Sequence, residues 1–228
     1  MNIPRITWQQ IQEKDKKVIN KIWSERIMTV VATRTVDFIK YTLGYSDFHK
    51  IVIIASKGNN WGDAILTASF LCAQGYQTKL FLLCSEDNLW EDTKNNLEVY
   101  KNLGWEIIDL LEDGDLIIDW IFGTGLTSSP KAESAEYIQK INNMEANVLS
   151  LDIPSGLDAT TGEVFCPCVK ANWSITFHIP KEWLFSDKAK EVVGQLWSVE
   201  SGLTFIEFPE LQADLNEFYS ESNIVRIY

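Results

Sequence analysis

Positive charge is scarce in this sequence, which has 20 Lys and Arg residues against 32 Asp and Glu, for a formal net charge of −12. Nucleic-acid faces and anionic membrane surfaces require clustered Lys and Arg, so we expect neither as a partner. No apolar run approaches the ~18 residues of a membrane-spanning helix, and the N-terminus lacks the basic and apolar regions of a signal peptide. The four cysteines also lack the spacing of a disulfide framework. We therefore predict a cytoplasmic protein with reduced thiols.

The chain has enough apolar residues for one domain, because 46% of its 228 residues are hydrophobic. Strand-like and helix-like periods alternate, which predicts a Rossmann-like α/β fold: a three-layer αβα sandwich with a mostly parallel sheet, preceded by two helices. The acidic segment 208–228 is expected to be mobile or to pack on a sheet edge. The predicted strands cover residues 51–54, 78–84, 105–110, 115–122, 147–152, 173–177 and 195–199, and the predicted helices cover residues 8–23, 26–43, 64–73, 90–103 and 132–143.

The segment Lys50–Gly75 predicts a buried strand, a loop of small and amide residues, and a buried helix. Such a turn directs free backbone N–H groups at one point, which attracts anions. The loop contains neither GxGxxG nor GxxxxGK[ST], and this argues against an ordinary Rossmann reductase or methyltransferase. From this pattern alone, a structural crossover and a phosphate site are about equally supported.

Polar residues cluster at the ends of three predicted strands. These clusters are Lys57–Asp63, Asp119 together with Phe122–Ser129, and Leu151–Asp158. If the strands are ordered 3-2-1-4-5, the first, fourth and fifth are neighbours, and their carboxyl ends share one crevice. Each cluster alone could be a turn or a helix cap, but the three together favour a ligand site.

Several motifs in these clusters resemble the NAD(P)H-hydrate epimerase family, also called the YjeF N-terminal domain family. Gly58-Asn-Asn-Trp-Gly-Asp63 is similar to the family's Gly-Asn-Asn-Gly-Gly-Asp loop. Asp115-Leu-Ile-Ile-Asp-Trp-Ile-Phe-Gly-Thr-Gly-Leu126 resembles its Asp-Ala-Leu-Phe-Gly-Thr-Gly-Leu segment, and Leu151-Asp-Ile-Pro-Ser-Gly-Leu-Asp-Ala-Thr-Thr-Gly-Glu163 matches its most distinctive motif. Asp15 and Thr176-Phe-His-Ile-Pro-Lys181 also fit the family pattern. The resemblance covers about residues 7–199 and implies one domain of this type spanning residues 1–228.

The resemblance implies an isomerase that interconverts the R and S forms of hydrated NADH and NADPH, serving a separate ADP- or ATP-dependent dehydratase. It also implies a potassium ion held by Asn60, Asp119 and Ser155, whose amide, carboxylate and hydroxyl oxygens suit an alkali cation. Asp152 would lie beside the reacting ring and act as the general acid–base. The residues implied to hold the dinucleotide are Asn59, Asn60, Trp61, Gly62, Asp63, Gly123, Thr124, Gly125, Leu126, Thr127, Ser128, Ser129 and Asp152.

The chain departs from the family pattern at several positions. Trp61 replaces a glycine, and its indole is expected either to stack on the nicotinamide or to block it. In the second helix, Thr29 and Val30 replace a glutamate and an asparagine. Because these changes remove polar groups near the expected crevice, a catalytically silent nucleotide-binding or scaffold module is the alternative function.

Other features leave alternatives open or concern assembly. Lys181 is expected to contact a phosphate or to be solvated, and His178 to belong to the site or to serve the structure only. Cys166 and Cys168 are expected to be free thiols in a loop, because their spacing is too tight for a zinc site. The resemblance also implies a homodimer, with Trp8 and Trp23 at or near its interface.

Overall fold

The computed structural model describes residues 3–7, 9–11, 13–14, 24–44, 47–56, 60–83, 91–123 and 125–228. Most of the predicted first helix, including Trp8 and Trp23, therefore lies outside the described residues. Its start does not: residues 9–11 and 13–14 are helical, and the Thr7 hydroxyl accepts a bond from the Gln10 amide. The Gln10 side chain accepts one from the Thr7 amide in return, at 2.8 Å, which is the reciprocal pattern of a capping box.

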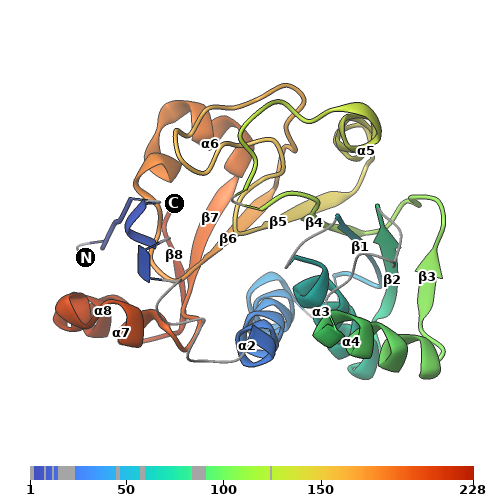
Figure 1. The fold of residues 1–228 in the computed structure, drawn as a ribbon, viewed down its shortest axis with the longest axis horizontal. Coiled ribbons are helices and arrows are strands. Elements are labelled where there is room, and N and C mark those ends of the chain that lie inside the picture. The colour runs from blue at the N-terminus through green and yellow to red at the C-terminus, as the bar shows by residue number, and fades with distance from the viewer. Residues whose placement is uncertain are drawn as a thin grey trace.

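One eight-stranded sheet organises the described part of the chain, in the order β3-β2-β1-β4-β5-β6-β7-β8 (Figure 1). All neighbouring strands are parallel except β7 and β8, which are antiparallel. The first five strands have the order 3-2-1-4-5 that a shared site requires, so the strand order reverses between β1 and β4. The strands are β1 (Lys50–Ala55), β2 (Gln77–Leu82), β3 (Glu106–Ile108), β4 (Leu116–Trp120), β5 (Asn147–Leu151), β6 (Trp173–Phe177), β7 (Gln195–Val199) and β8 (Ile224–Arg226).

Helices cover both faces of this sheet, as the αβα prediction requires. Alternate residues of β1 face opposite ways, so Ile51 and Ile53 pack in one core cluster with α2, α3 and α4, while Val52 and Ile54 pack in a second with α5. Burial on both faces explains why β1 is an uninterrupted apolar run. The helices are α2 (Ser24–Asp37), the π-helix η1 (Phe38–Gly44), α3 (Asn60–Ala73), α4 (Glu91–Asn102), α5 (Ala132–Asn142), the 3₁₀-helix η3 (Glu182–Phe185), α6 (Asp187–Val193), α7 (Thr204–Glu207), the 3₁₀-helix η4 (Pro209–Leu211) and α8 (Gln212–Phe218).

The C-terminal segment packs on the sheet edge. Strand β8 pairs with β7, and Phe208, Leu215 and Phe218 are buried in a cluster that also contains Ile6. Of the two expectations for residues 208–228, edge packing is confirmed and mobility is wrong. The acidic composition of the segment gave no sign of this packing, because its few apolar residues are gathered in one buried cluster.

Several predicted strands are shorter in the structure than expected. The predicted strand 105–110 pairs only over β3, the predicted strand 115–122 pairs only over β4, and the predicted strand 78–84 ends at Leu82 of β2. Just before β4, the Asp115 amide donates to the Lys50 carbonyl at 2.8 Å, and the Asp115 carboxylate accepts bonds from the His49 and Lys50 amides, at 2.9 and 2.8 Å. Within the described residues, the structure has no helix that is both long enough and apolar enough to cross a membrane.

Candidate functional site

The three predicted clusters converge at the carboxyl ends of the central strands. In the parallel register, Asp119 of β4 lies between Ile54 of β1 and Ser150 of β5. Ser155 in the next loop bonds to Asp119, which joins the second and third clusters. Asp63 in the first turn of α3 is close enough to Asp152 for their charges to interact, which brings in the first cluster. Residues 57–59 and Thr124 lie outside the described part of the chain.

Asp119 is a fully buried carboxyl group surrounded by neutral donors. Its oxygens accept bonds from the Ser155 hydroxyl at 2.6 Å, the Ser155 amide at 2.8 Å, the Ser150 hydroxyl at 2.9 Å and the Ile121 amide at 3.2 Å. Burial raises the pKa of Asp119, because desolvation outweighs these four bonds. A buried carboxylate held by amides and hydroxyls, in a set of oxygen donors only, is a setting that an alkali cation fits.

Asp152 adopts a conformation that few non-glycine residues take, with φ of 66°. Its amide donates to the Ile175 carbonyl at 2.7 Å, and its carboxylate forms an ion pair with the Lys181 ammonium. The Lys181 side chain is only 3% exposed, against 25% for Asp152. A buried lysine is costly unless it is paired. The pairing with Asp152 therefore fixes both groups beside the carboxyl ends of β5 and β6.

Lys181 also donates to the Thr176 hydroxyl at 2.8 Å and to the Phe177 carbonyl at 3.4 Å. Its three ammonium hydrogens thus have three acceptors, all within the protein. The expectation of a solvated lysine is wrong. In the pattern Thr176-Phe177…Lys181, Thr176 lies on β6, beside the strand that leads to Asp152, and its hydroxyl helps to hold the lysine.

Asp63 is the second carboxyl group of the site. Burial, and to a smaller extent the charge of the neighbouring Asp152, raise its pKa from 3.8 to about 8. At neutral pH the site therefore contains a protonated Asp63 carboxyl group near the Asp152–Lys181 ion pair.

Trp61 lies in the hydrophobic core. Its side chain is 1% exposed and belongs to the cluster beneath β1, so the indole neither stacks in the crevice nor blocks it. The next residue, Gly62, leaves no room for a side chain, because Met28 of α2 packs against this turn. A Cβ atom at Gly62 would come within 2.4 Å of the Met28 sulfur. Only the backbone of Trp61 and Gly62 is left to face a ligand at the start of α3.

The loop after β4 lies at the surface. Gly123 and Leu126 are half-buried, and Gly125, Thr127, Ser128 and Ser129 are exposed. Its start is fixed because the Phe122 amide donates to the Ser155 hydroxyl at 2.8 Å. Their exposure leaves these residues accessible to a ligand that reaches the strand ends.

Sequence reasoning left the role of His178 open and missed its partners. His178 follows β6 with φ of 63°, and its Nδ1 lies 2.7 Å from the Ser201 hydroxyl and 3.3 Å from a Glu207 carboxylate oxygen. Burial, and to a smaller extent the charge of Lys181, lower the pKa of His178 to about 4, against an opposing effect of Asp152. A neutral histidine thus lies close enough to the Asp152–Lys181 pair to feel both charges. No signal in the sequence links residue 178 to residues 201 and 207.

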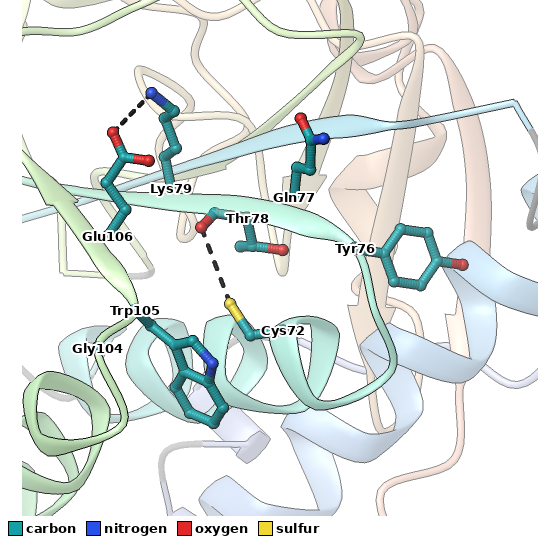
Figure 2. Close-up of a pocket in the computed structure, with 8 residues that line it drawn as sticks. All are labelled: Cys72, Tyr76, Gln77, Thr78, Lys79, Gly104, Trp105 and Glu106. Atoms are coloured by element: carbon teal, nitrogen blue, oxygen red, sulfur yellow. Dashed lines mark hydrogen bonds and ion pairs between the residues drawn. The ribbon is translucent and has the colours of Figure 1, made fainter.

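A separate hollow of about 280 Å³ lies at the other end of the sheet, by the starts of β2 and β3. Figure 2 shows Cys72 and Trp105 on one side of β2 and the Lys79 ammonium on the other, where it meets Glu106. Burial raises the pKa of the Cys72 thiol, so it is a poor nucleophile at neutral pH. Across the described residues there is no group of three or more His, Cys, Asp and Glu side chains placed to hold a metal ion.

Comparisons with known proteins agree with the motifs. Residues 24–183 match the family model described as YjeF-related protein N-terminus. The chain is 34% identical over 166 residues to the bifunctional NAD(P)H-hydrate repair enzyme Nnr of Moorella thermoacetica, covering 68% of this chain and 31% of that protein. It is 28% identical over 207 residues to the NAD(P)H-hydrate epimerase of Oenococcus oeni, covering 87% of this chain and 96% of that one.

The comparison with solved structures supports the same α/β fold. The crystal structure of yeast ynu0 superimposes with a TM-score of 0.73 at 16% identity, covering 86% of this chain and 88% of that one. The chain thus spans about a third of the bifunctional relative and nearly all of the single-function one. A family-model match over more than two thirds of the chain, with the motifs gathered in one crevice, leads to one conclusion: the chain belongs to the YjeF-related protein N-terminus family.

Proposed function

We propose that this protein is an NAD(P)H-hydrate epimerase, an isomerase that interconverts the R and S hydrates of NADH and NADPH. The observation that carries the proposal is the Asp152–Lys181 ion pair at the crevice floor, with the protonated Asp63 carboxyl group close by. Relatives bearing the name NAD(P)H-hydrate epimerase are similar along nearly their whole length, which supports the same activity here.

The reaction needs a group that gives a proton and later takes it back. In the hydrate, one ring carbon bears a hydroxyl group and lies next to the ring nitrogen. If the hydroxyl oxygen is protonated, water leaves with the C–O electron pair, and the nitrogen lone pair stabilises the planar cation. Water then adds to the opposite face and returns a proton to the carboxylate. We assign this proton transfer to Asp152: its carboxylate, paired with Lys181, first takes a proton from the neighbouring Asp63 carboxyl group, which carries one at neutral pH, and passes it to the departing hydroxyl.

Lys181 orients the base and compensates its charge. Because the ammonium is buried and bound by Thr176 and Phe177, it holds the Asp152 carboxylate in one position. The left-handed backbone of Asp152 directs the same carboxylate out of the end of β5. Both features cost stability and are therefore typical of a functional site.

The dinucleotide is proposed to bind across the strand ends. Backbone N–H groups from Asn60 to Asp63 at the start of α3 suit its phosphates, together with Asn59 in the preceding loop. The loop from Gly123 to Ser129 would contact the rest of the dinucleotide. The indole of Trp61 has no part in this proposal, because it is buried in the core.

A potassium ion is proposed to bind beside Asp119. Asn60, Asp119 and Ser155 would hold it, and the buried Asp119 carboxyl group with its neutral donors supports this fit. When bound, the ion would offset the substrate's negative charge in a strongly acidic protein.

We propose two partners for this chain, a dehydratase and a second copy of the chain itself. The bifunctional relatives support a dehydratase that acts on the same hydrates, and for this chain we propose a separate dehydratase protein. We also propose a homodimer, with Trp8 and Trp23 near its interface, to be tested by light scattering at micromolar concentration. A monomer mass there would contradict it.

The decisive experiment is to incubate the protein with pure R-hydrate and to follow the S-hydrate by chromatography. We expect conversion well above the spontaneous rate in buffer. A rate equal to that of buffer would remove the epimerase proposal and leave the nucleotide-binding or scaffold module as the function.

A further inference from the structure

The turn that follows β6 places Lys181. His178 begins this turn in a left-handed conformation, and Ile179 and Pro180 are buried before Lys181 is reached. A left-handed histidine persists only where its surroundings impose that conformation. The position of the Lys181 ammonium therefore depends on what holds residues 178–182.

Hydroxyl groups from β7 and the C-terminal segment hold the His178 carbonyl. It accepts a bond from the Tyr219 hydroxyl at 2.7 Å and one from the Ser198 hydroxyl at 3.0 Å. These two hydroxyls lie 2.8 Å from each other. The Tyr219 ring is buried against Phe218, with centroids 4.7 Å apart, so its packing does not depend on its hydroxyl.

Other contacts hold the same turn from its ring side and from the N-terminal segment. The His178 ring lies against Ser201 and Glu207, as described above. From the N-terminal segment, the Ile6 amide donates to the Pro180 carbonyl at 3.3 Å, and the Ile6 carbonyl accepts a bond from the Glu182 amide at 3.0 Å. Ile6, Ser201, Glu207 and Tyr219 all lie outside the residues matched by the family model, which are 24–183.

We propose that Tyr219 is a positioning residue for the reaction: it fixes the left-handed His178 and so holds Lys181 against Asp152. The C-terminal segment thereby completes a site whose reacting groups all come from the family-matched region. This inference rests on the proposed function for its kinetic readout, and its structural readout is independent of activity.

The test compares Tyr219→Phe with Tyr228→Phe. Both substitutions remove one hydroxyl that donates to a backbone carbonyl, since Tyr228 donates to the Leu184 carbonyl at 2.8 Å. We expect Tyr219→Phe to lower kcat about tenfold with KM within about twofold, as the loss of one hydrogen bond allows, and Tyr228→Phe to leave both unchanged. Hydrogen exchange of the His178 and Glu182 amides should become about tenfold faster in Tyr219→Phe alone.

Each outcome decides the proposal. Unchanged exchange at His178 and Glu182 in Tyr219→Phe overturns it, as does an unchanged kcat in an active enzyme. Equal losses in both variants also overturn it, because they would reflect general destabilisation. If the wild type has no epimerase activity, the proposed function fails and the exchange comparison alone decides. Should Tyr219→Phe not fold, Ser198→Ala, which removes the other donor to His178, takes its place with the same expectations.

Discussion

The two ends of the sheet both carry ion pairs, and the pairs differ in burial. At the amino ends, Lys79 meets Glu106 at 2.7 Å and Glu112 at 3.0 Å, with exposed fractions of 20%, 55% and 42%. At the carboxyl ends, Lys181 meets Asp152 with exposed fractions of 3% and 25%. The first cluster is solvated and replaceable, whereas the second is costly to form and fixed in geometry.

The backbone shows the same contrast. Asp152 and His178 both have positive φ values and lie at the carboxyl ends of adjacent strands. Among the residues that line the hollow by the starts of β2 and β3, only Gly104 has a positive φ, of 73°, and a glycine adopts it without strain. The comparison teaches that a hollow with charged residues is not enough to identify a site. Buried charge on strained backbone is the stronger indication.

The largest expected effect is at Asp152. Asn is one of the few residues that tolerate the left-handed conformation, so Asp152→Asn should fold and keep its backbone there. It removes the proton-transfer group, and we expect the epimerisation rate to fall about 10²–10⁴-fold with dinucleotide binding retained. Single-turnover rates and unfolding curves on one preparation measure both quantities. A variant that lost stability but kept its rate per folded molecule would show that Asp152 only stabilises the turn.

The second largest effect is expected from potassium, which should act at the carboxyl ends of the strands and not at the amino ends. If the ion binds beside Asp119 and only in the folded state, the free energy of unfolding should rise with its concentration. The increase is about 2.7 kcal/mol at a hundredfold excess over the dissociation constant. Urea unfolding in potassium chloride and in tetramethylammonium chloride at equal ionic strength measures it. Equal stability in the two salts would contradict the proposed ion.

The sequence was sufficient for the fold because its signals are local or periodic. Apolar runs for β1, β4 and β5 and the helical periods between them predict the strands, the helices and a mostly parallel sheet. The three strand-end clusters predict the crevice, since parallel strands end at one edge. The edge packing of residues 208–228 was left open, because its apolar residues reach the sheet only through long-range contacts.

Side-chain orientation in the site was not predictable in the same way. Trp61 replaces a family glycine, and its ring turns inward because it packs in the core cluster with residues of α2, α3 and β1. Lys181 is buried because Asp152, Thr176 and Phe177 surround it, which no local pattern reveals. The Asn172 side chain accepts a bond from the Val148 amide at 2.7 Å at the amino end of β5, at the opposite end of the strand from Asp152.

For each pH unit, a smaller effect than that of potassium is expected at Asp63. Its pKa of about 8 lies above the ordinary 3.8, so the folded state binds an additional proton between about pH 4 and 8. The contribution of this group to stability is therefore complete at low pH and is lost as the pH rises toward 8. Asp63→Asn mimics the protonated form, and its stability relative to wild type should increase across this window, by at most about 1.4 kcal/mol for each pH unit.

The quantity to measure is the difference in free energy of unfolding between Asp63→Asn and the wild type, because the titration of His178 changes stability in the opposite direction. Its pKa of about 4 lies below 6.5, so it adds stability as the pH rises between those values. In the wild type the two slopes oppose each other below pH 6.5, whereas subtraction of the two urea-unfolding curves removes the His178 contribution. A constant difference from pH 5 to pH 8 would mean that Asp63 is ionised throughout.

The smallest effect is expected at the amino ends. Glu106→Gln removes one partner of Lys79 but leaves the Glu112 contact, and the lost carboxylate is more than half exposed. Exposed pairs contribute little because water and salt screen them, so the variant should match the wild type in melting temperature and in epimerisation rate within error. The same assay that detects the Asp152→Asn loss provides the comparison. A clear fall in rate with unchanged stability would show that the hollow beside Cys72 communicates with the crevice, and the contrast between the two ends of the sheet would then be wrong.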